Sequence, residues 1–209
     1  AAPPTQSVEW AATGLEKVNI EPGPIVYPMT GGKKLLQIMV DLWTDIATML
    51  SKPPTEHSTT LLLLPKFAPD DWDRFQLASH VVVKTLTCLG VDELASVVFF
   101  HPFYERDAVE PVHEPIHGHL PPGQMLRSML LVFYDMDEII DMDSTLHQND
   151  YSRRTPFPMI NVLRSEQVQL AEQLTSGTKV YCTNARKMAT SDATELARAL
   201  AKDMVADSP

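Results

Sequence analysis

Three side chains in two short, proline-containing phrases have the chemistry to act together on a small anionic molecule. His101 lies in SVVFFHPFY at 96–104, and Arg154 and Arg164 lie in NDYSRRTPFPMINVLR at 149–164. Imidazole exchanges a proton near neutral pH, and the planar guanidinium fork binds carboxylate or phosphate through two bonds. The pattern indicates acid–base catalysis by His101 on an anion clamped by the arginines. Structural roles stay open: a histidine bonded to a turn, and arginine ion pairs that hold a loop.

The prolines of both phrases predict where these side chains meet. Proline fixes φ and removes a backbone donor, so HPFY and TPFP each predict a rigid corner beside a regular element. In α/β folds, site residues gather beyond the C-terminal ends of strands. We therefore expect His101 and Arg154 on neighbouring loops, in one polar crevice. There Arg154 is expected to pair with an acid, or to share a bound anion with Arg164.

A group of histidines and acids in the middle of the chain has the composition of a zinc site, but not the spacing. The group comprises Glu110, His113, Glu114, His117 and His119. Its H-x3-H-x-H spacing lies between prolines, so no helix face aligns the first two histidines as zinc ligands. The acids at 135–143 lack the central glycine and final glutamate of an EF-hand. TGGKK at 30–34 lacks the GxxxxGK[ST] phosphate loop, and the sequence predicts neither a metal nor a cofactor.

The phrases FHPFY and NDYSRRTPFPMINVLR resemble two phrases of the DUF1415 family, whose members pair FHPxY with NRxPYPxxHLLRE. The second phrase keeps Arg154, Pro156, Pro158 and Arg164, with Phe157 in place of the tyrosine. Arg153, Asn161 and Ser165 stand where the family has asparagine, histidine and glutamate. The resemblance extends over most of the chain outside a central insertion, and it implies an enzyme-like α/β domain.

The positions that differ from the family remove the groups best suited to catalysis. Relatives carry GLNLCPF near the first helix, whereas this chain reads GLEKVNIEPGP from Gly14 and has no cysteine there. A thiol nucleophile needs a thiolate and a nearby base. Asn161, in place of the family's histidine, cannot transfer a proton near neutral pH. If the family acts through these two groups, the resemblance implies that this chain has lost the reaction.

The composition is that of an acidic chain with enough apolar residues for a core. The chain has 209 residues, of which 44% are hydrophobic, and a net charge of -10. Nucleic acids and anionic lipid surfaces attract basic proteins, so neither is an expected partner. No apolar run approaches the ~18–20 residues of a membrane span, and the chain is expected to be soluble or peripheral to a membrane. Cys88 and Cys182 lie outside any CxxC and are expected to be reduced, buried thiols.

Apolar periodicity and end signals predict an α/β or α+β domain with a small sheet covered by helices. Helices are predicted at 7–18, 33–51, 72–89 and after the capping box of Asp192 and Glu195, and strands at 59–64 and 96–100. Residues 160–175 are predicted to form a helix, or a strand that turns into one. The segment 59–100 predicts a βαβ-like unit. We expect a disordered tail at 1–6 and a single domain over 7–209.

Residues 105–148 form an insertion about forty residues longer than a connection between elements needs to be. Its apolar run predicts one side of a helix, with the expected partner-binding residues Met125, Leu126, Met129, Leu130, Phe133 and Tyr134. A contiguous apolar patch is costly in water, and Met and aromatic side chains are enriched at protein contacts. The insertion is therefore predicted to bind other protein subunits.

Two functional classes follow. The first is a non-catalytic peripheral subunit of an organellar multiprotein assembly, of the kind found in energy-transducing membranes. AAPPTQS lacks the charged and apolar regions of a signal peptide and fits the mature end left after transit-peptide removal. The expected location is a mitochondrion or else a plastid, with the cytoplasm as the alternative. The second class is an enzyme acting on a small anionic metabolite, with His101 as acid/base and Arg154 and Arg164 as anion clamp.

Overall fold

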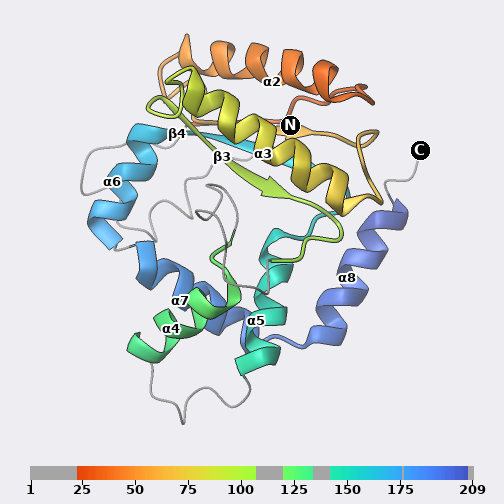
Figure 1. The fold of residues 1–209 in the computed structure, drawn as a ribbon, viewed down its shortest axis with the longest axis vertical. Helices are drawn as coiled ribbons and strands as arrows, with labels where there is room; N and C mark the ends of the chain where they lie inside the picture. The colour runs from red at the N-terminus through yellow and green to blue at the C-terminus, as the bar shows by residue number, and fades with distance from the viewer. Residues whose placement is uncertain (1–22, 107–119, 134–141, 176, 207–209) are drawn as a thin grey trace.

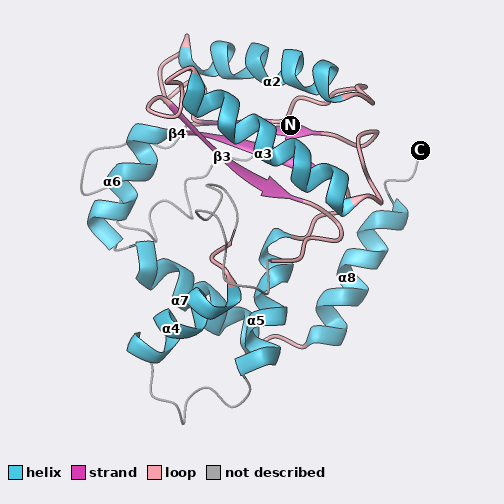
Figure 2. Cartoon of the chain, in the orientation of Figure 1, coloured by secondary structure: helices cyan, strands magenta, loops and turns pink. Residues whose placement is uncertain are grey.

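The computed structural model describes residues 23–106, 120–133, 142–175 and 177–206. Its strands are β1 (Ile25–Val26), β2 (Thr59–Leu63), β3 (Ala95–Phe100) and β4 (Met159–Arg164). Its helices are α2 (Leu35–Leu50), α3 (Trp72–Cys88), α4 (Gly123–Phe133), α5 (Met142–Asp150), α6 (Ser165–Thr175), α7 (Gly177–Ala189) and α8 (Ala193–Ala206), with a 3-10 turn η3 (Tyr151–Arg153). Figures 1 and 2 show this arrangement, which confirms the predicted α/β class. The predicted tail at 1–6 and helix at 7–18 lie outside the described residues.

The four strands form one mixed sheet in the order β1-β2-β4-β3. β1 pairs parallel with β2, and β4 runs antiparallel to both β2 and β3. β2 and β3 therefore run parallel to each other on either side of β4, and α3 connects them along the chain. The predicted βαβ-like unit is present, with a later strand between its two parallel strands. The ends of β2 and β3 and the start of β4 lie at one edge of the sheet.

Helices α2 and α3 cover one face of this sheet (Figure 1). Side chains alternate along β4, so Ile160 and Val162 are buried on the face that packs against these helices. The apolar positions of α2 that are buried, Ile38, Leu42, Ile46 and Met49, recur at helical spacing. These residues belong to one buried apolar cluster, which also contains Leu62, Leu64, Phe67, Ala68, Phe75, Ala78, Val82, Leu86, Ala95, Val97 and Phe99. Periodicity alone thus predicts which side of each element forms the core.

Polar end signals fix where the predicted helices begin and end. The Asp71 carboxylate accepts a hydrogen bond from Arg74 N at 3.0 Å and caps the start of α3. Gly90 follows α3 with φ +65°, in the left-handed region that favours glycine. The Asp192 carboxylate accepts from Thr194 N at 2.8 Å and Glu195 N at 3.3 Å, which confirms Asp192 as the cap of α8 and so the first half of the predicted capping box.

The predicted insertion contributes helices α4 and α5, which pack with α7 below the sheet (Figure 1). Leu126 and Leu130 are 0% and 1% exposed, and they form a second buried cluster with Cys182 and Ala185. These two leucines face the interior of their own chain, so the prediction that they bind a partner is wrong. The apolar side of α4 is covered by α7, which sequence spacing could not indicate.

The other residues of the predicted partner surface have mixed positions. Met129 packs partly against the second buried cluster, whereas Met125 is 49% exposed. The Phe133 side chain and the whole of Tyr134 lie outside the described residues. The described helices of the insertion, α4 and α5, therefore pack against the rest of the chain.

The two cysteines occupy different environments. Both are free thiols, as predicted, but only Cys182 is buried, and burial raises the pKa of its thiol. Cys88 is exposed at the end of α3, so the prediction of a buried thiol is wrong there. Among the described residues, no helix has the length and apolar character needed to cross a membrane.

Candidate functional site

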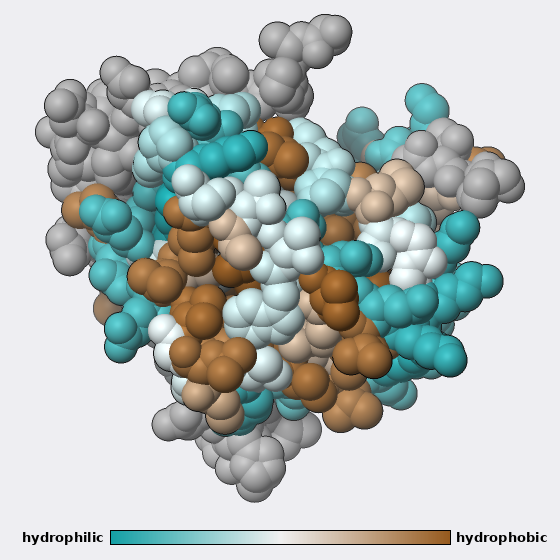
Figure 3. Space-filling view, turned by 90° about the horizontal axis from the view of Figure 1, so that it is seen from above, coloured by the Kyte–Doolittle hydropathy of each residue, from teal (hydrophilic) through white to brown (hydrophobic). Residues whose placement is uncertain are grey.

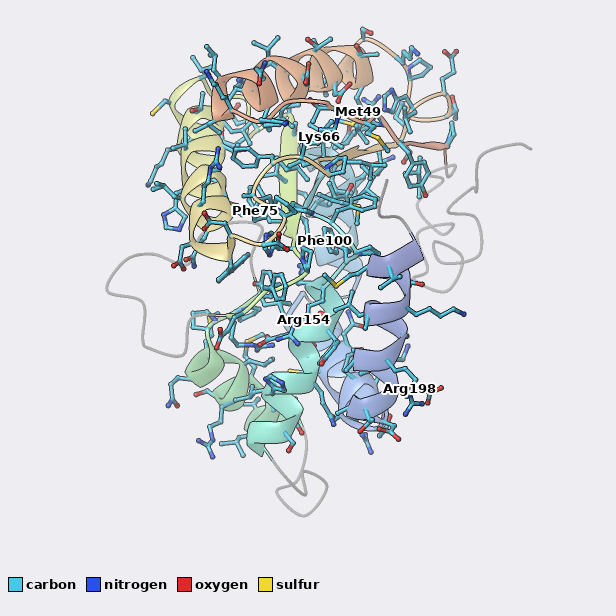
Figure 4. The ribbon with its side chains drawn as sticks, turned by 90° about the vertical axis from the view of Figure 1, so that its right-hand side faces the viewer. Met49, Lys66, Phe75, Phe100, Arg154 and Arg198 are labelled. Atoms are coloured by element: carbon cyan, nitrogen blue, oxygen red, sulfur yellow. The ribbon has the colours of Figure 1, made fainter. Side chains whose placement is uncertain are left out.

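The two proline-containing phrases meet at the edge of the sheet where β3 ends and β4 begins. His101 N donates a hydrogen bond to Arg153 O at 3.0 Å, and Arg154 Nε donates to Tyr104 O at 3.1 Å. Tyr104 N in turn donates to His101 O at 3.1 Å. Figure 4 shows Arg154 below Phe100, at the junction between the sheet and the lower helices. The expected neighbourhood of His101 and Arg154 is present, and we call it the phrase junction.

Both ring nitrogens of His101 are engaged in the fold. The side chain is 0% exposed, its Nδ1 accepts from Phe103 N at 3.1 Å, and its Nε2 lies 2.8 Å from Ala68 O. A carbonyl oxygen only accepts, so Nε2 carries the proton and the ring is neutral. Burial lowers the pKa of His101, against a smaller opposing effect of the Ala68 carbonyl. The imidazole has no free nitrogen to offer a substrate, which favours the structural role for this residue.

Arg154 is held by the junction itself. Besides the bond to the Tyr104 carbonyl, its guanidinium lies 4.4 Å from the centre of the Tyr151 ring, a distance typical of a cation–π contact. No carboxylate lies within 4.0 Å of Arg154 among the residues that the structure describes, but the charge of Arg154 acts from farther away to lower the pKa of Asp150. The expected acid partner is therefore replaced by a carbonyl and an aromatic face.

Arg164 lies at the opposite end of β4, and its side chain contacts carbonyl groups at and after the end of α2. Its terminal nitrogen Nη2, which carries two protons, lies within hydrogen-bond distance of three carbonyls, at 2.5 Å from Met49 O, 2.6 Å from Lys52 O and 3.0 Å from His57 O. Carbonyl groups at the C-terminal end of a helix lack intrahelical partners and carry partial negative charge, so a guanidinium is favourable there. Because Arg154 precedes β4 and Arg164 ends it, the two arginines do not form one anion clamp.

Asn161 lies in the middle of β4, where it is paired with Leu61 on β2 and Val98 on β3. The alternation of the strand directs it to the sheet face opposite α2 and α3. Its Oδ1 is buried and has no hydrogen-bond partner. The residue that replaces the family's histidine is thus separated from His101, which lies beyond the end of β3.

A buried ion pair that sequence reasoning missed extends the phrase junction. Arg106 Nε donates to Asp150 Oδ1 at 2.6 Å, and the two side chains are only 6% and 5% exposed. Burial raises the pKa of Asp150, with Arg106 opposing part of this effect. The remaining nitrogens of Arg106, Nη1 and Nη2, are buried without a hydrogen-bond partner. The only sequence signal was position, because Arg106 follows FHPFY directly and Asp150 lies within the second phrase.

The prediction about metal ions can be compared only with the residues that the structure describes. No group of three or more His, Cys, Asp or Glu side chains that could hold a metal ion occurs in the described ranges. The histidine and glutamate group at 110–119 lies outside these ranges, as do most of the acids at 135–143.

The exposed side chains of α2 are all uncharged, and its two aspartates, Asp41 and Asp45, are half-buried. Its exposed side chains are Leu36, Gln37, Val40, Thr44, Ala47 and Thr48. The hydroxyl groups of Thr44 and Thr48 donate to the carbonyls of Val40 and Thr44, at 2.8 and 2.7 Å, and so are used within the helix. A helix surface that meets only water normally carries charged residues. This composition is therefore more typical of a contact surface.

Two exposed apolar residues of α3 extend this surface, beside exposed charged residues of the same helix. Arg74 at the start of α3 donates to the carbonyl of Lys33 just before α2, at 2.9 Å, so the two helices begin side by side. Figure 3 looks down on these helices and shows hydrophobic side chains gathered across them. The exposed ones are Leu36 and Val40 on α2, at 76% and 58%, and Leu77 and Val81 on α3, at 67% and 38%. We call these four residues the α2–α3 face.

Residues 16–114 match the family described as a protein of unknown function, DUF1415. The match confirms the family resemblance over this segment, which contains FHPFY and strands β1 to β3 but ends before α4, β4 and the second phrase. The chain matches no curated protein and no solved structure.

Proposed function

We propose that this protein is a non-catalytic subunit that binds another protein through the α2–α3 face. The observation that carries the proposal is the outer surface of α2, where none of the exposed side chains is charged. Exposed apolar patches rimmed by polar residues mark protein interaction sites. The contact is thus assigned to α2 and α3, and not to the apolar side of α4, which its own chain covers.

The arrangement of the phrase junction supports the non-catalytic part of the proposal. His101 is neutral, buried and bonded at both nitrogens, and Arg154 and Arg164 contact carbonyl groups at opposite ends of a strand. None of the three offers free hydrogen-bonding groups in the arrangement needed for acid–base work on an anion. The enzyme class that relied on these residues is therefore the weaker candidate.

We assign the face to a different protein rather than to a second copy of this chain. Two copies would each bring a net charge of -10 to the contact and would repel. A partner with an apolar helical surface and a less acidic body would bury the same four side chains without that cost. Within this proposal the partner belongs to an organellar assembly, mitochondrial or plastid, to which the subunit is peripheral.

The binding part is tested by native purification of the tagged full-length protein from its source cells. Val40→Lys and Leu77→Lys each place a charge on the α2–α3 face. Val205→Lys is the matched control, since Val205 is 76% exposed on α8. We expect one defined set of proteins to be recovered with the wild type and the control, and at least tenfold less with either face variant. Equal recovery with all four proteins contradicts the proposed face.

The choice between a different protein and a second copy is tested by light scattering of the purified chain over a range of concentrations. We expect a monomer throughout. A dimer that Val40→Lys dissociates and Val205→Lys leaves intact would reassign the face to self-association. Fractionation of the source cells tests the organellar placement, which a purely cytoplasmic protein would contradict.

The non-catalytic part is tested by complementation of a deletion strain. Cys88→Ser combined with Cys182→Ala removes both thiols. We expect this variant to restore the phenotype as well as the wild type does. Loss of function by a variant whose melting temperature is unchanged would reveal thiol chemistry and overturn the assignment.

A further inference from the structure

A pocket whose lining contains four charged residues borders the phrase junction at the Arg106–Asp150 pair. It has a volume of about 260 Å³ and lies between the loop after β3, the start of α4 and the end of α5. Its lining residues are Glu105, Arg106, Gly123, Gln124, Arg127, Leu146, His147 and Asp150. This volume is smaller than that of a typical drug-sized site and suits a compact group of a few atoms.

The central feature of this pocket is the incomplete bonding of Arg106. Its side chain is 6% exposed and uses Nε on Asp150, while Nη1 and Nη2 are buried with no hydrogen-bond partner in the structure. A buried polar group without a partner is costly, and a buried charged group more so. The Arg106 stem lies beside Gly123, with its Cδ 4.0 Å from the place a Cβ there would take, so this stem passes the start of α4. Nη1 and Nη2 of Arg106 would therefore be stabilised by a hydrogen-bond acceptor bound in the pocket.

The two arginines and two acids of the lining balance in formal charge, but two further features favour an anion at the start of α4. α4 begins at Gly123 after two prolines, and its first backbone N–H groups lack intrahelical acceptors. The positive end of the helix dipole lies at the same place. Arg127, one turn along α4, and His147, in the last turn of α5, complete the lining. Asp150 is paired with Arg106, so Glu105 is the remaining opposing charge among the described lining residues.

We propose that this pocket binds a compact oxyanion, the phosphoryl or carboxylate end of a small molecule. The anion accepts hydrogen bonds from the terminal nitrogens of Arg106 and from the first N–H groups of α4, and Arg127 covers it from the solvent side. This site is separate from the α2–α3 face and involves no residue of the proposed protein contact. It differs also from the clamp that the sequence suggested, since neither Arg154 nor Arg164 takes part.

The site is tested by titrating the full-length protein with inorganic phosphate and, separately, with succinate. Ionic strength is held constant with chloride, and binding is followed by calorimetry. Backbone amide shifts of Gly123 and Gln124 report whether the anion reaches the start of α4. Phosphate bound more tightly than succinate indicates a phosphoryl ligand, and the reverse order indicates a carboxylate ligand. The absence of both binding and amide shifts at millimolar concentrations of either anion overturns the proposal.

Three variants of exposed residues give opposite expectations. Arg127→Ala removes a cation and is expected to raise Kd about five- to tenfold, as the loss of one charge-assisted bond would. Glu105→Gln removes the opposing charge and is expected to lower Kd about two- to threefold. Arg198→Ala, on the distant helix α8 labelled in Figure 4, is the matched control and leaves Kd unchanged. Equal affinity in Arg127→Ala, Glu105→Gln and the wild type overturns the site even if phosphate binds elsewhere.

Discussion

Two structural halves of this molecule are each stabilised by a different kind of contact. The first half is the sheet with α2 and α3, and the second half is the group of helices α4, α5 and α7. Around the sheet, α2 and α3, seventeen of the described side chains form one buried apolar cluster, whereas around α4, α5 and α7 four do. The second half has in addition the buried Arg106–Asp150 pair. Apolar burial stabilises roughly in proportion to area, so among the described side chains the first half contributes more to the free energy of folding. The second half depends on correctly paired polar groups, and small changes there should alter local structure before they unfold the protein.

The largest expected effect is in the first half. Phe75→Ala removes a ring that is 1% exposed and lies 5.0 Å from the His101 ring and 6.2 Å from the Phe99 ring, centre to centre. It is expected to lower the free energy of unfolding by about 3–5 kcal/mol, compared with about 2–3 kcal/mol for Leu130→Ala in the second half. Urea denaturation measures both values. Hydrogen exchange should show Leu130→Ala loosening α4 and α7 alone, and a uniform loosening would mean that the halves do not differ.

The buried pair gives the next effect. Asp150→Ala leaves the Arg106 guanidinium buried without its partner, and a loss of about 3 kcal/mol is expected. Arg106→Met in the same chain removes the charge as well, so the double variant should be more stable than Asp150→Ala alone. Thermal unfolding of the two variants makes the comparison. A double variant that is less stable than Asp150→Ala would show that Arg106 has a larger role in packing than in charge pairing.

The two arginines near the ends of β4 are expected to differ in how much they contribute to stability. Arg164→Met loses contacts to three carbonyls of the first half and should cost about 2 kcal/mol, whereas Arg154→Met loses one carbonyl and an aromatic contact and should cost about 1 kcal/mol. Denaturation midpoints at neutral pH test the order. The reverse order would place more of the stability in the phrase junction than its contacts suggest.

The smallest effect is a change of pH dependence. Burial lowers the pKa of His101 below its unfolded value of 6.5, so the unfolded chain binds a proton that the folded chain rejects. The stability that the neutral His101 contributes is fully present above pH 6.5 and is lost as the pH falls below 6.5. His101→Gln should therefore make stability fall less steeply on acidification from 7 to 5. His57 acts in the same direction and Asp150, whose pKa is raised, in the opposite one, so the slope is compared only between the wild type and this variant. An unchanged slope would contradict a neutral, buried His101.

The sequence predicted the first half better because its elements carry their own signals. Helix α2 has its apolar residues at helical spacing, α3 is preceded by Asp71 and followed by Gly90, and β2 and β3 are short apolar runs. The position of β4 between β2 and β3 was not predictable, because nothing local specifies which strands pair. The same holds for the covering of α4 by α7, which turned a predicted partner surface into interior.

The functional residues show the same limit. Proline corners correctly predicted that the two phrases meet, since backbone geometry is a local property. They could not indicate that His101 would be bonded at both nitrogens, or that Arg164 would turn to the end of α2. Arg106 was overlooked for a related reason. A lone arginine in a sequence gives no sign of which of its nitrogens will find partners.

The central position of β4 has a consequence for how the chain is synthesised. While β2, α3 and β3 leave the ribosome, the strand that joins them has not yet been made, and it follows only after α4 and α5. During that interval β2 and β3 each have an unpaired edge rich in leucine, valine and phenylalanine, of the kind that recruits strands from other chains. Production of this protein in a foreign host should thus depend strongly on translation rate and on chaperones that shield nascent chains. Fragments ending before residue 159 should aggregate even though they contain most of the apolar core.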